Sequence, residues 1–522
     1  MSLLLVLLLV LPLGSALALL LLPRAAGEQV AAAAGVTASG LTLAVAVLSL
    51  AARPWSSGTP VLDVDLPWIP ALGVRLHLSL DGLNTPLVLL TAALGLAVCV
   101  MAARAAPSGG SRRSLVVCLL AVQGGALATF TASDLVLFFV AFEVVLVPMW
   151  ALIRWWGDPH DPAGRRDAAA RFVLYTALGS AIMLAGLLLI AIQAGTSDIV
   201  ALTAAHGAGI DRSVQVVAAG LLVVGLAVKV PVWPLHTWLA PAHTAAPTVG
   251  SVLLAAVLLK MGSYGLVRLA VPLVPQGFEA VAPFLGAFGV VGILWGGLVC
   301  LVERDLKRLV AFSSVAHMGF VALGVASGTP QGLQGALFAN IAHAVITGLL
   351  FVVAGGLKDR FASARLSDIG GGLRERTPRL GALLAFGAVA GLGLPGLAGF
   401  WGELLAVYGA WQAGSGSGFW KVLAVGALVG TALAAAYLLR VLRALWHGAS
   451  VPAASGGVPA ASGGAPGATA SATSAPDASG LELAVAVPLV VVTVLLGLAP
   501  WLLLRLTEPA VRHLLGLGRG TV

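Results

Sequence analysis

The chain has 522 residues, of which 59% are hydrophobic and only 10% are charged. Soluble domains carry about 25% charged residues, so a chain this long with so little charge cannot cover a water-facing surface. The net charge of +8 does not predict a nucleic-acid partner, because the basic residues lie between long apolar runs, where orientation in a bilayer accounts for them. Cys99, Cys118 and Cys300 form no CxxC pair, so neither a metal site nor an iron–sulfur cluster is predicted.

Apolar runs of the length needed to cross a bilayer, about 20 residues, occur about fourteen times along the chain. The sequence therefore predicts an all-α, polytopic membrane protein. The first run is followed by Arg24 rather than preceded by a basic residue, so we interpret it as a retained helix and not a cleaved signal. The predicted spans are 2–22, 31–52, 83–103, 114–132, 134–155, 170–194, 213–231, 246–270, 280–302, 308–327, 332–357, 380–411, 420–445 and 481–506.

The basic residues predict the orientation of these spans. With the N-terminus outside, nineteen of the 29 Lys and Arg residues fall on the cytoplasmic side and eight on the outer side. The other two, Lys229 and Lys260, lie inside spans. This asymmetry agrees with the positive-inside rule and predicts a multi-pass protein of a bacterial plasma membrane.

The order of the spans suggests an internal repeat. His317 follows Glu143 by 174 residues, and Glu403 follows Lys229 by the same number. Both offsets fit two five-helix repeats, helices 4–8 and helices 9–13, and an odd number of helices inverts the second copy. The predicted segments are helices 1–3 in 1–113, repeats in 114–270 and 280–445, a flexible Ala/Gly/Ser/Pro linker in 446–480 and a last helix in 481–506.

Prolines predict breaks inside three of these helices. Pro231 and Pro234 follow Lys229 in helix 7, Pro395 precedes Glu403 in helix 12, and a further proline follows Glu143 in helix 5. Proline removes a backbone donor and clashes with the preceding turn. Transporters place ion sites at such breaks, although proline and glycine are also simply frequent in membrane helices.

Four charged residues lie well inside apolar spans: Glu143, Lys229, Lys260 and Glu403. Each costs about 2.5–3.5 kcal/mol at the bilayer centre on insertion scales. The alternative to function is a pair of buried ion pairs that only fix helix packing. Intramembrane ionisable residues mark ion or proton paths by default, so we predict a proton relay.

Histidines add groups that titrate near neutral pH. His317 and His343 lie in the middle of spans, and His236 and His243 flank the predicted break in helix 7. We predict that His317 belongs to the relay and that the other three form a secondary proton path. The sequence contains no Walker A run, no plausible GxGxxG unit and no Ser/His/Asp arrangement, so an ion gradient or a partner must supply the energy.

Several motifs resemble the antiporter-like family shared by the L, M and N subunits of respiratory complex I, membrane-bound hydrogenases and Mrp-type cation/proton antiporters. The most specific stretch runs from Lys229-Val-Pro-Val-Trp-Pro-Leu-His-Thr-Trp-Leu239 through Ala246-Pro-Thr-Val-Gly250 to Leu259-Lys-Met-Gly-Ser-Tyr-Gly265. Phe138-Phe-Val-Ala-Phe-Glu143 and Gly396-Leu-Ala-Gly-Phe-Trp-Gly-Glu403 match the family's helix 5 and helix 12 motifs. Glutamate in helix 12 is typical of M subunits. The family's Leu-Pro-Asp-Ala-His is replaced by Leu239-Ala-Pro-Ala-His243, which leaves open a diverged paralogue.

The resemblance implies a mechanism. Glu143 and Lys229 form an ion pair whose making and breaking shifts the proton affinity of Lys229. Lys229 then exchanges its proton with Lys260 through His317 and water, and Glu403 leads to the outer side or to the next subunit.

The resemblance also implies partners and an energy source. It implies L- and N-type neighbours, and it places NADH, FMN, iron–sulfur clusters and quinone in partner subunits, with no cofactor and no metal in this chain. The alternatives are an Mrp-type antiporter subunit, a hydrogenase membrane subunit and a structural membrane subunit that transports nothing.

Overall fold

The fold is taken from a computed structural model of the chain. The structure describes residues 2–22, 27–51, 58–104, 109–416, 418–448 and 475–517. Most of the predicted 446–480 linker lies outside the described residues.

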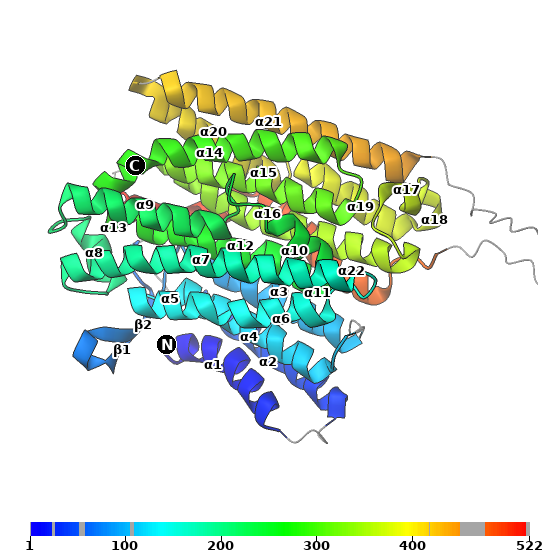
Figure 1. The fold of residues 1–522 in the computed structure, drawn as a ribbon, viewed down its shortest axis with the longest axis horizontal. Helices are drawn as coiled ribbons and strands as arrows, with labels where there is room; N and C mark the ends of the chain where they lie inside the picture. The colour runs from blue at the N-terminus through cyan, green and yellow to red at the C-terminus, as the bar shows by residue number, and fades with distance from the viewer. Residues whose placement is uncertain are drawn as a thin grey trace, which may run out of the picture.

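Long helices run side by side along the molecule (Figure 1), with α1 and α2 on one flank and α21 on the opposite flank. By length and composition, thirteen helices in the described ranges are able to cross a membrane, and the span predicted at 380–411 is divided into two shorter helices. The fourteen predicted spans are therefore all found as helices. The undivided ones are α1 (Ser2–Leu21), α2 (Gly27–Ser49), α3 (Thr85–Arg104), α4 (Arg112–Thr131), α7 (Pro162–Ala194), α14 (Pro275–Val302), α15 (Leu306–Ala326), α16 (Pro330–Phe361), α21 (Gly418–Leu442) and α22 (Gly480–Leu498), and helix 7 begins with α9 (Arg212–Lys229).

The remaining spans are interrupted, three of them near the proline positions. Helix 5 is divided into α5 (Leu135–Val144) and α6 (Leu146–Trp156), and helix 12 into α19 (Pro378–Gly391) and α20 (Ala398–Ala413). Helix 7 ends as α9 at Lys229 and resumes as α10 (Leu239–Ala245). Helix 8 contains two wide π turns and runs as α11 (Thr248–Leu253), η3 (Leu254–Leu258), α12 (Leu259–Gly265), η4 (Leu266–Ala270) and α13 (Val271–Leu273).

Short elements complete the bundle. The last predicted span, 481–506, ends earlier than expected, because the chain breaks near Pro500 and starts a separate helix at Trp501. The short helices are α8 (Ile199–Ala205), α17 (Leu366–Ile369), α18 (Leu373–Arg376), α23 (Trp501–Leu514) and the single turns η2 (Pro70–Leu72), η5 (Gly414–Gly416) and η6 (Arg443–His447).

A β-hairpin is the one departure from the all-α prediction among the described residues. Strands β1 (Leu62–Ile69) and β2 (Val74–Leu80) pair antiparallel, with Leu62 opposite Leu80. Apolar and acidic residues alternate in Leu62-Asp-Val-Asp-Leu66, and a period of two residues is typical of a β-strand. This pattern is the sequence signal that indicates β1. Gly73 closes the turn with a φ of +67°, which glycine adopts without steric cost.

The helices divide into an inner and an outer set. Helix 8 and α16 are enclosed by protein along their whole apolar stretch, whereas α7 exposes Leu174 and Ile192, and α21 exposes Val422. Apolar side chains on the outside match a lipid surrounding.

The two ends of the molecule also differ (Figure 1). The β-hairpin and α8 lie at one end, here called the hairpin end, and α10, α17 and α18 lie toward the other, here called the basic end.

Candidate functional site

Lys260 forms the centre of a buried chain of proton-carrying groups. Its side chain is fully buried, and its Nζ lies 2.6 Å from Nδ1 of His343 and donates to the carbonyl of Ala255 at 3.0 Å. Lys260 sits in α12 between the two π turns of helix 8. Such turns release backbone carbonyls from the helical ladder and are frequent at functional sites.

The chain continues from His343 to Glu403 across three further helices. The rings of His343 on α16 and His317 on α15 lie 6.0 Å apart between centroids, at 63° to each other. His317 Nδ1 lies 3.2 Å from Oε1 of Glu403 on α20, and Thr431 donates to Oε2 of Glu403 at 3.2 Å. Lys260, His343, His317 and Glu403 therefore form one path through the middle of the bundle.

A small cavity borders this path. Its volume is about 30 Å³, and its lining includes His317, His343, Glu403, Ser313 and Thr347. A site of this size with polar walls has room for roughly two water molecules. The Nε2 atom of His343 has no hydrogen-bond partner among the described residues, which leaves it free to bond to such a water.

The contacts correct the predicted order of the relay. His317 was expected between Lys229 and Lys260, but it lies beyond His343 and touches Glu403 instead. Sequence position fixes how deep a residue lies along its helix, but neighbours in space depend on how the helices pack. The position that His317 was expected to fill, next to Lys260, is taken by His343.

Glu143 and Lys229 are not in contact as the expected ion pair. Within the described part of the chain, no ion pair joins them at 4.0 Å or less. Lys229 is 3% exposed, and its Nζ lies 4.7 Å from the centre of the Phe142 ring. Glu143 is partly exposed, but it is close enough for its charge to act on Lys229. The two residues thus stand as an open pair, with the ammonium held over an aromatic face.

His236 and His243 lie on either side of the start of α10. His236 is 6% exposed, and its Nδ1 has no hydrogen-bond partner among the described residues. His243 is fully buried and stacks on Phe351 with ring centroids 4.4 Å apart, and neither ring nitrogen has a partner in the described ranges. Buried polar groups are normally hydrogen-bonded, so these free nitrogens call for water or for a functional use.

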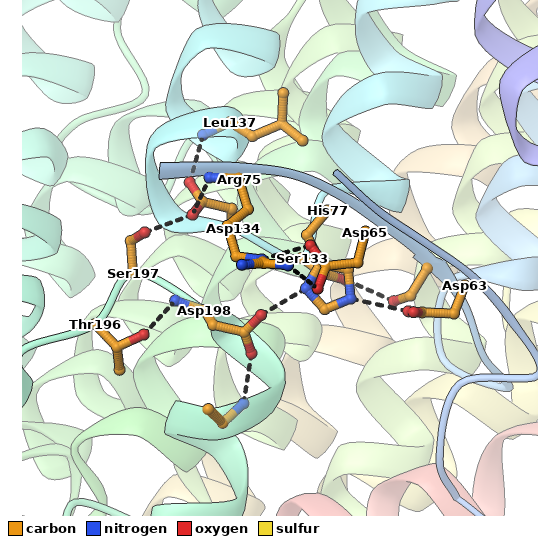
Figure 2. A network of polar contacts seen from close by, with 12 residues as sticks. Asp63, Asp65, Arg75, His77, Ser133, Asp134, Leu137, Thr196, Ser197 and Asp198 are labelled. Carbon is orange, nitrogen blue, oxygen red and sulfur yellow. Dashed lines mark hydrogen bonds and ion pairs between the residues drawn. The ribbon is translucent and has the colours of Figure 1, made fainter. Parts of the chain in front are cut away.

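A second polar network holds the hairpin end together (Figure 2). His77 on β2 lies between two carboxylates, with Nδ1 2.6 Å from Asp198 and Nε2 2.8 Å from Asp63. Burial lowers the pKa of His77, but the two carboxylates raise it more, so the net pKa is about 9. His77 is therefore charged at neutral pH and joins β1, β2 and α8.

Asp134 connects this network to the helix that carries Glu143. Its Oδ1 accepts from the backbone N–H groups of Val136 and Leu137, which caps α5. Its Oδ2 accepts from Ser197 at 2.5 Å and from the backbone N–H of Arg75 at 3.3 Å (Figure 2). Capping explains why this aspartate stands at the edge of a span.

Lys307 is a buried lysine, although it is one of the nineteen basic residues that the sequence places on the cytoplasmic side. It is 2% exposed and donates to the carbonyl of Ala246 at 2.9 Å. It stands in the first turn of α15, near the end of a span, and its burial follows from the packing of the helices, not from the sequence pattern. In the described part of the chain, no group of three or more His, Cys, Asp and Glu side chains is arranged to hold a metal ion.

The family model described as "NADH:quinone oxidoreductase/Mrp antiporter, TM" matches residues 132–431, a stretch that contains every residue of the buried path. The chain belongs to this family. The family assignment confirms the resemblance predicted from the helix 5, 7, 8 and 12 motifs, and with it a multi-pass membrane protein.

Relatives and solved structures give the same family. The chain is 35% identical over 518 residues to NADH-quinone oxidoreductase subunit M of Rhodobacter capsulatus, covering 97% of this chain and 94% of that protein. A chain of respiratory complex I from Thermus thermophilus with bound NADH matches with a TM-score of 0.83 at 30% identity, covering 98% of this chain and 100% of that one. A chain of the Mrp complex from Dietzia sp. DQ12-45-1b matches with a TM-score of 0.83 at 25% identity, covering 99% and 98%.

Proposed function

We propose that this chain is the M-type proton-translocating membrane subunit of NADH-quinone oxidoreductase. The observation that carries the proposal is the buried path from Lys260 through His343 and His317 to Glu403. The 35% identity to a subunit M along nearly the whole chain supports the assignment to this enzyme. In this role the N-terminus lies outside a bacterial plasma membrane, and L- and N-type subunits are neighbours.

The open pair of Glu143 and Lys229 is the coupling element in this proposal. When the pair closes, the carboxylate stabilises the protonated form of Lys229, and when it opens, the ammonium loses that partner. Lys229 then releases its proton toward Lys260. Because these groups interact, they titrate as a set and not one by one.

In this proposal, the energy that drives proton movement comes from other subunits. NADH oxidation and quinone reduction take place in partner subunits that hold FMN, iron–sulfur clusters and quinone. This chain binds none of them and contributes only proton movement.

Replacement of the paired residues tests the proposal. In the assembled complex, Glu143→Gln and Lys229→Ala should each lower NADH-driven proton pumping by roughly tenfold or more, because each removes a proton-carrying group. Electron transfer from NADH to an artificial acceptor should survive. Glu279→Gln, which changes an exposed glutamate on α14, is the control and should pump normally. Unchanged pumping in both variants would disprove the proposed function.

A second candidate is an Mrp-type cation/proton antiporter subunit. The match to a chain of the Dietzia Mrp complex, with the same TM-score as the complex I match, favours it. Glu403 favours the M-type reading, because glutamate at this helix 12 position is typical of M subunits. Neighbouring genes for NADH-oxidising subunits separate the two candidates, since an antiporter has no redox partner.

A further inference from the structure

Two aromatic rings enclose the end of the Lys229 side chain. Its Nζ lies 4.7 Å from the ring centre of Phe142 on α5 and 6.0 Å from the ring centre of Phe172 on α7. Both rings are at most 2% exposed, so water does not screen these contacts. A cation over the face of a desolvated ring is attracted by the electron density of that face. The two rings, here called the aromatic seat, therefore suit the charged form of Lys229.

The Phe142 ring is fixed in place by further rings. It stacks on Phe138, one turn earlier in α5, with the two centroids 5.9 Å apart and the planes at 27°. Phe138 in turn lies 6.5 Å from the ring of Tyr264 on helix 8, and Phe130 packs edge-on against Tyr264 at 5.5 Å. Phe142 is thus the end of a column of buried rings, and close packing in this column keeps its face toward Lys229.

The break in helix 7 holds the second ring of the seat. Trp238, which follows the break, packs edge-on against Phe172 with centroids 5.6 Å apart. Its indole Nε1 donates to the carbonyl of Val228 at 3.0 Å, and Val228 is the residue before Lys229. The chain after the break therefore folds back on the end of α9 and places an aromatic wall beside the lysine.

The base of the Lys229 side chain is fixed, but its end is able to move. The end of α9 packs so closely on α12 that a Cβ at Gly262 would lie 2.9 Å from Cβ of Lys229. Glu143 directly follows Phe142 in α5, so the carboxylate and the ring leave the helix about 100° apart. Rotation about the bonds of the lysine stem is enough to move the ammonium from one to the other, and no helix has to shift.

We infer that the protonated Lys229 side chain switches between two positions, the aromatic seat and the Glu143 carboxylate. A cation–π contact between buried partners is of the same order as a hydrogen bond to a charged group, so the two positions are close in free energy. A carboxylate is able to take the proton back, whereas an aromatic ring has no site for it. The seat therefore keeps the lysine charged and apart from Glu143 until the proton moves on toward Lys260. This inference rests on the proposed function.

Fluorination of Phe142 tests the seat, because fluorine withdraws electron density from the ring face and changes the size of the ring little. In the assembled complex, phenylalanine with one, two or three ring fluorines at position 142 should lower NADH-driven pumping stepwise, by roughly fivefold or more with three. Phe142→Leu, which removes the ring, should pump no better than the trifluorinated protein. Pumping is normalised to NADH oxidation with an artificial acceptor, which corrects for assembly.

Phe139 provides the matched control. It lies in the same helix, α5, and its ring makes no cation–π contact within the described ranges. The same three fluorinated residues at position 139 should leave pumping unchanged. Constant pumping across the Phe142 series, or an equal decline in the Phe139 series, would overturn the aromatic seat.

The Glu143→Gln and Lys229→Ala variants separate failure of the seat from failure of the proposed function. If the Phe142 series pumps normally while these two variants do not, the seat is wrong and the proposed function still stands. If both variants also pump normally, the proposed function itself fails.

Discussion

At the scale of single residues, burial and a missing partner distinguish groups that look equivalent in the sequence. His343 bonds to Lys260, His317 contacts Glu403, and His243 has neither nitrogen bonded to any described residue. All three are histidines in or beside apolar helices, so their types alone do not separate them. Their surroundings assign the first two to the buried path and leave the third free.

His77 makes the hairpin end sensitive to pH. Its pKa is raised from 6.5 to about 9 by Asp198 and Asp63, so its contribution to stability is complete below about pH 6.5 and is lost as the pH rises through 9. The contribution is on the order of 1–2 kcal/mol after allowance for solvent screening at the half-exposed Asp63. Hydrogen exchange of the β1–β2 amides, corrected for intrinsic rates, should therefore show less protection at pH 10 than at pH 7.

The variant His77→Gln serves as the reference for this measurement. It should lose protection at pH 7 already and show little further change up to pH 10. The Arg75–Asp65 ion pair of the same hairpin is present in both proteins. The same pH dependence in His77→Gln and in the unmodified protein would rule out His77 as the titrating group.

At the scale of single elements, helix ends and breaks place the proton-carrying residues. Lys229 is the last residue of α9, Lys260 lies between two π turns, and Glu403 stands in the second turn after the break between α19 and α20. Pro241 stands where the family's Leu-Pro-Asp-Ala-His motif has its aspartate, and the structure explains why a proline is tolerated there. Pro241 falls in the first turn of α10, where the missing N–H has no helical partner to lose.

The N-cap of α5 is a testable example of such an element. Asp134→Ala should remove the capping bonds to Val136 and Leu137, along with those from Ser197 and Arg75, and lower stability by at least the roughly 0.5–2 kcal/mol that a lost N-cap costs. Thermal unfolding of the purified complex, monitored through the loss of its activity, measures the change in stability. Asp211→Ala is the control, because Asp211 stands at the N-cap of α9 but makes no side-chain capping bond there. Equal losses in both variants would contradict the capping role.

At the scale of the whole molecule, close helix packing brings the path together. α16 carries His343 and α20 carries Glu403, and these helices meet where small residues such as Gly402 and Ala339 face each other. A Cβ at Gly402 would lie 2.6 Å from the Cα of Ala339, so only glycine fits at that crossing. Separation of the two helices would move Glu403 away from His317.

Addition of a single methyl group tests this packing. Gly402→Ala should push α20 away from α16, cost about 1–3 kcal/mol and reduce pumping, because the His317–Glu403 contact depends on that crossing. Gly220→Ala in α9 is the matched control, since a Cβ there meets nothing within 4 Å. That change should be neutral or slightly stabilising. Normal pumping by Gly402→Ala would show that the crossing tolerates a wider separation.

The sequence by itself determined the membrane class, the helices that form the spans, the breaks near Lys229 and Glu403 and the charged residues that interrupt the long apolar runs. These follow from hydropathy, proline chemistry and the cost of a charge in lipid, which act locally along the chain. The predicted inverted repeats stay a prediction. Only the tertiary structure decided that His317 lies beside Glu403, that Lys307 is buried and that Glu143 and Lys229 stand apart. The physical reason is that helical periodicity sets the depth of a side chain, whereas its neighbours depend on how each helix is rotated and packed against the others.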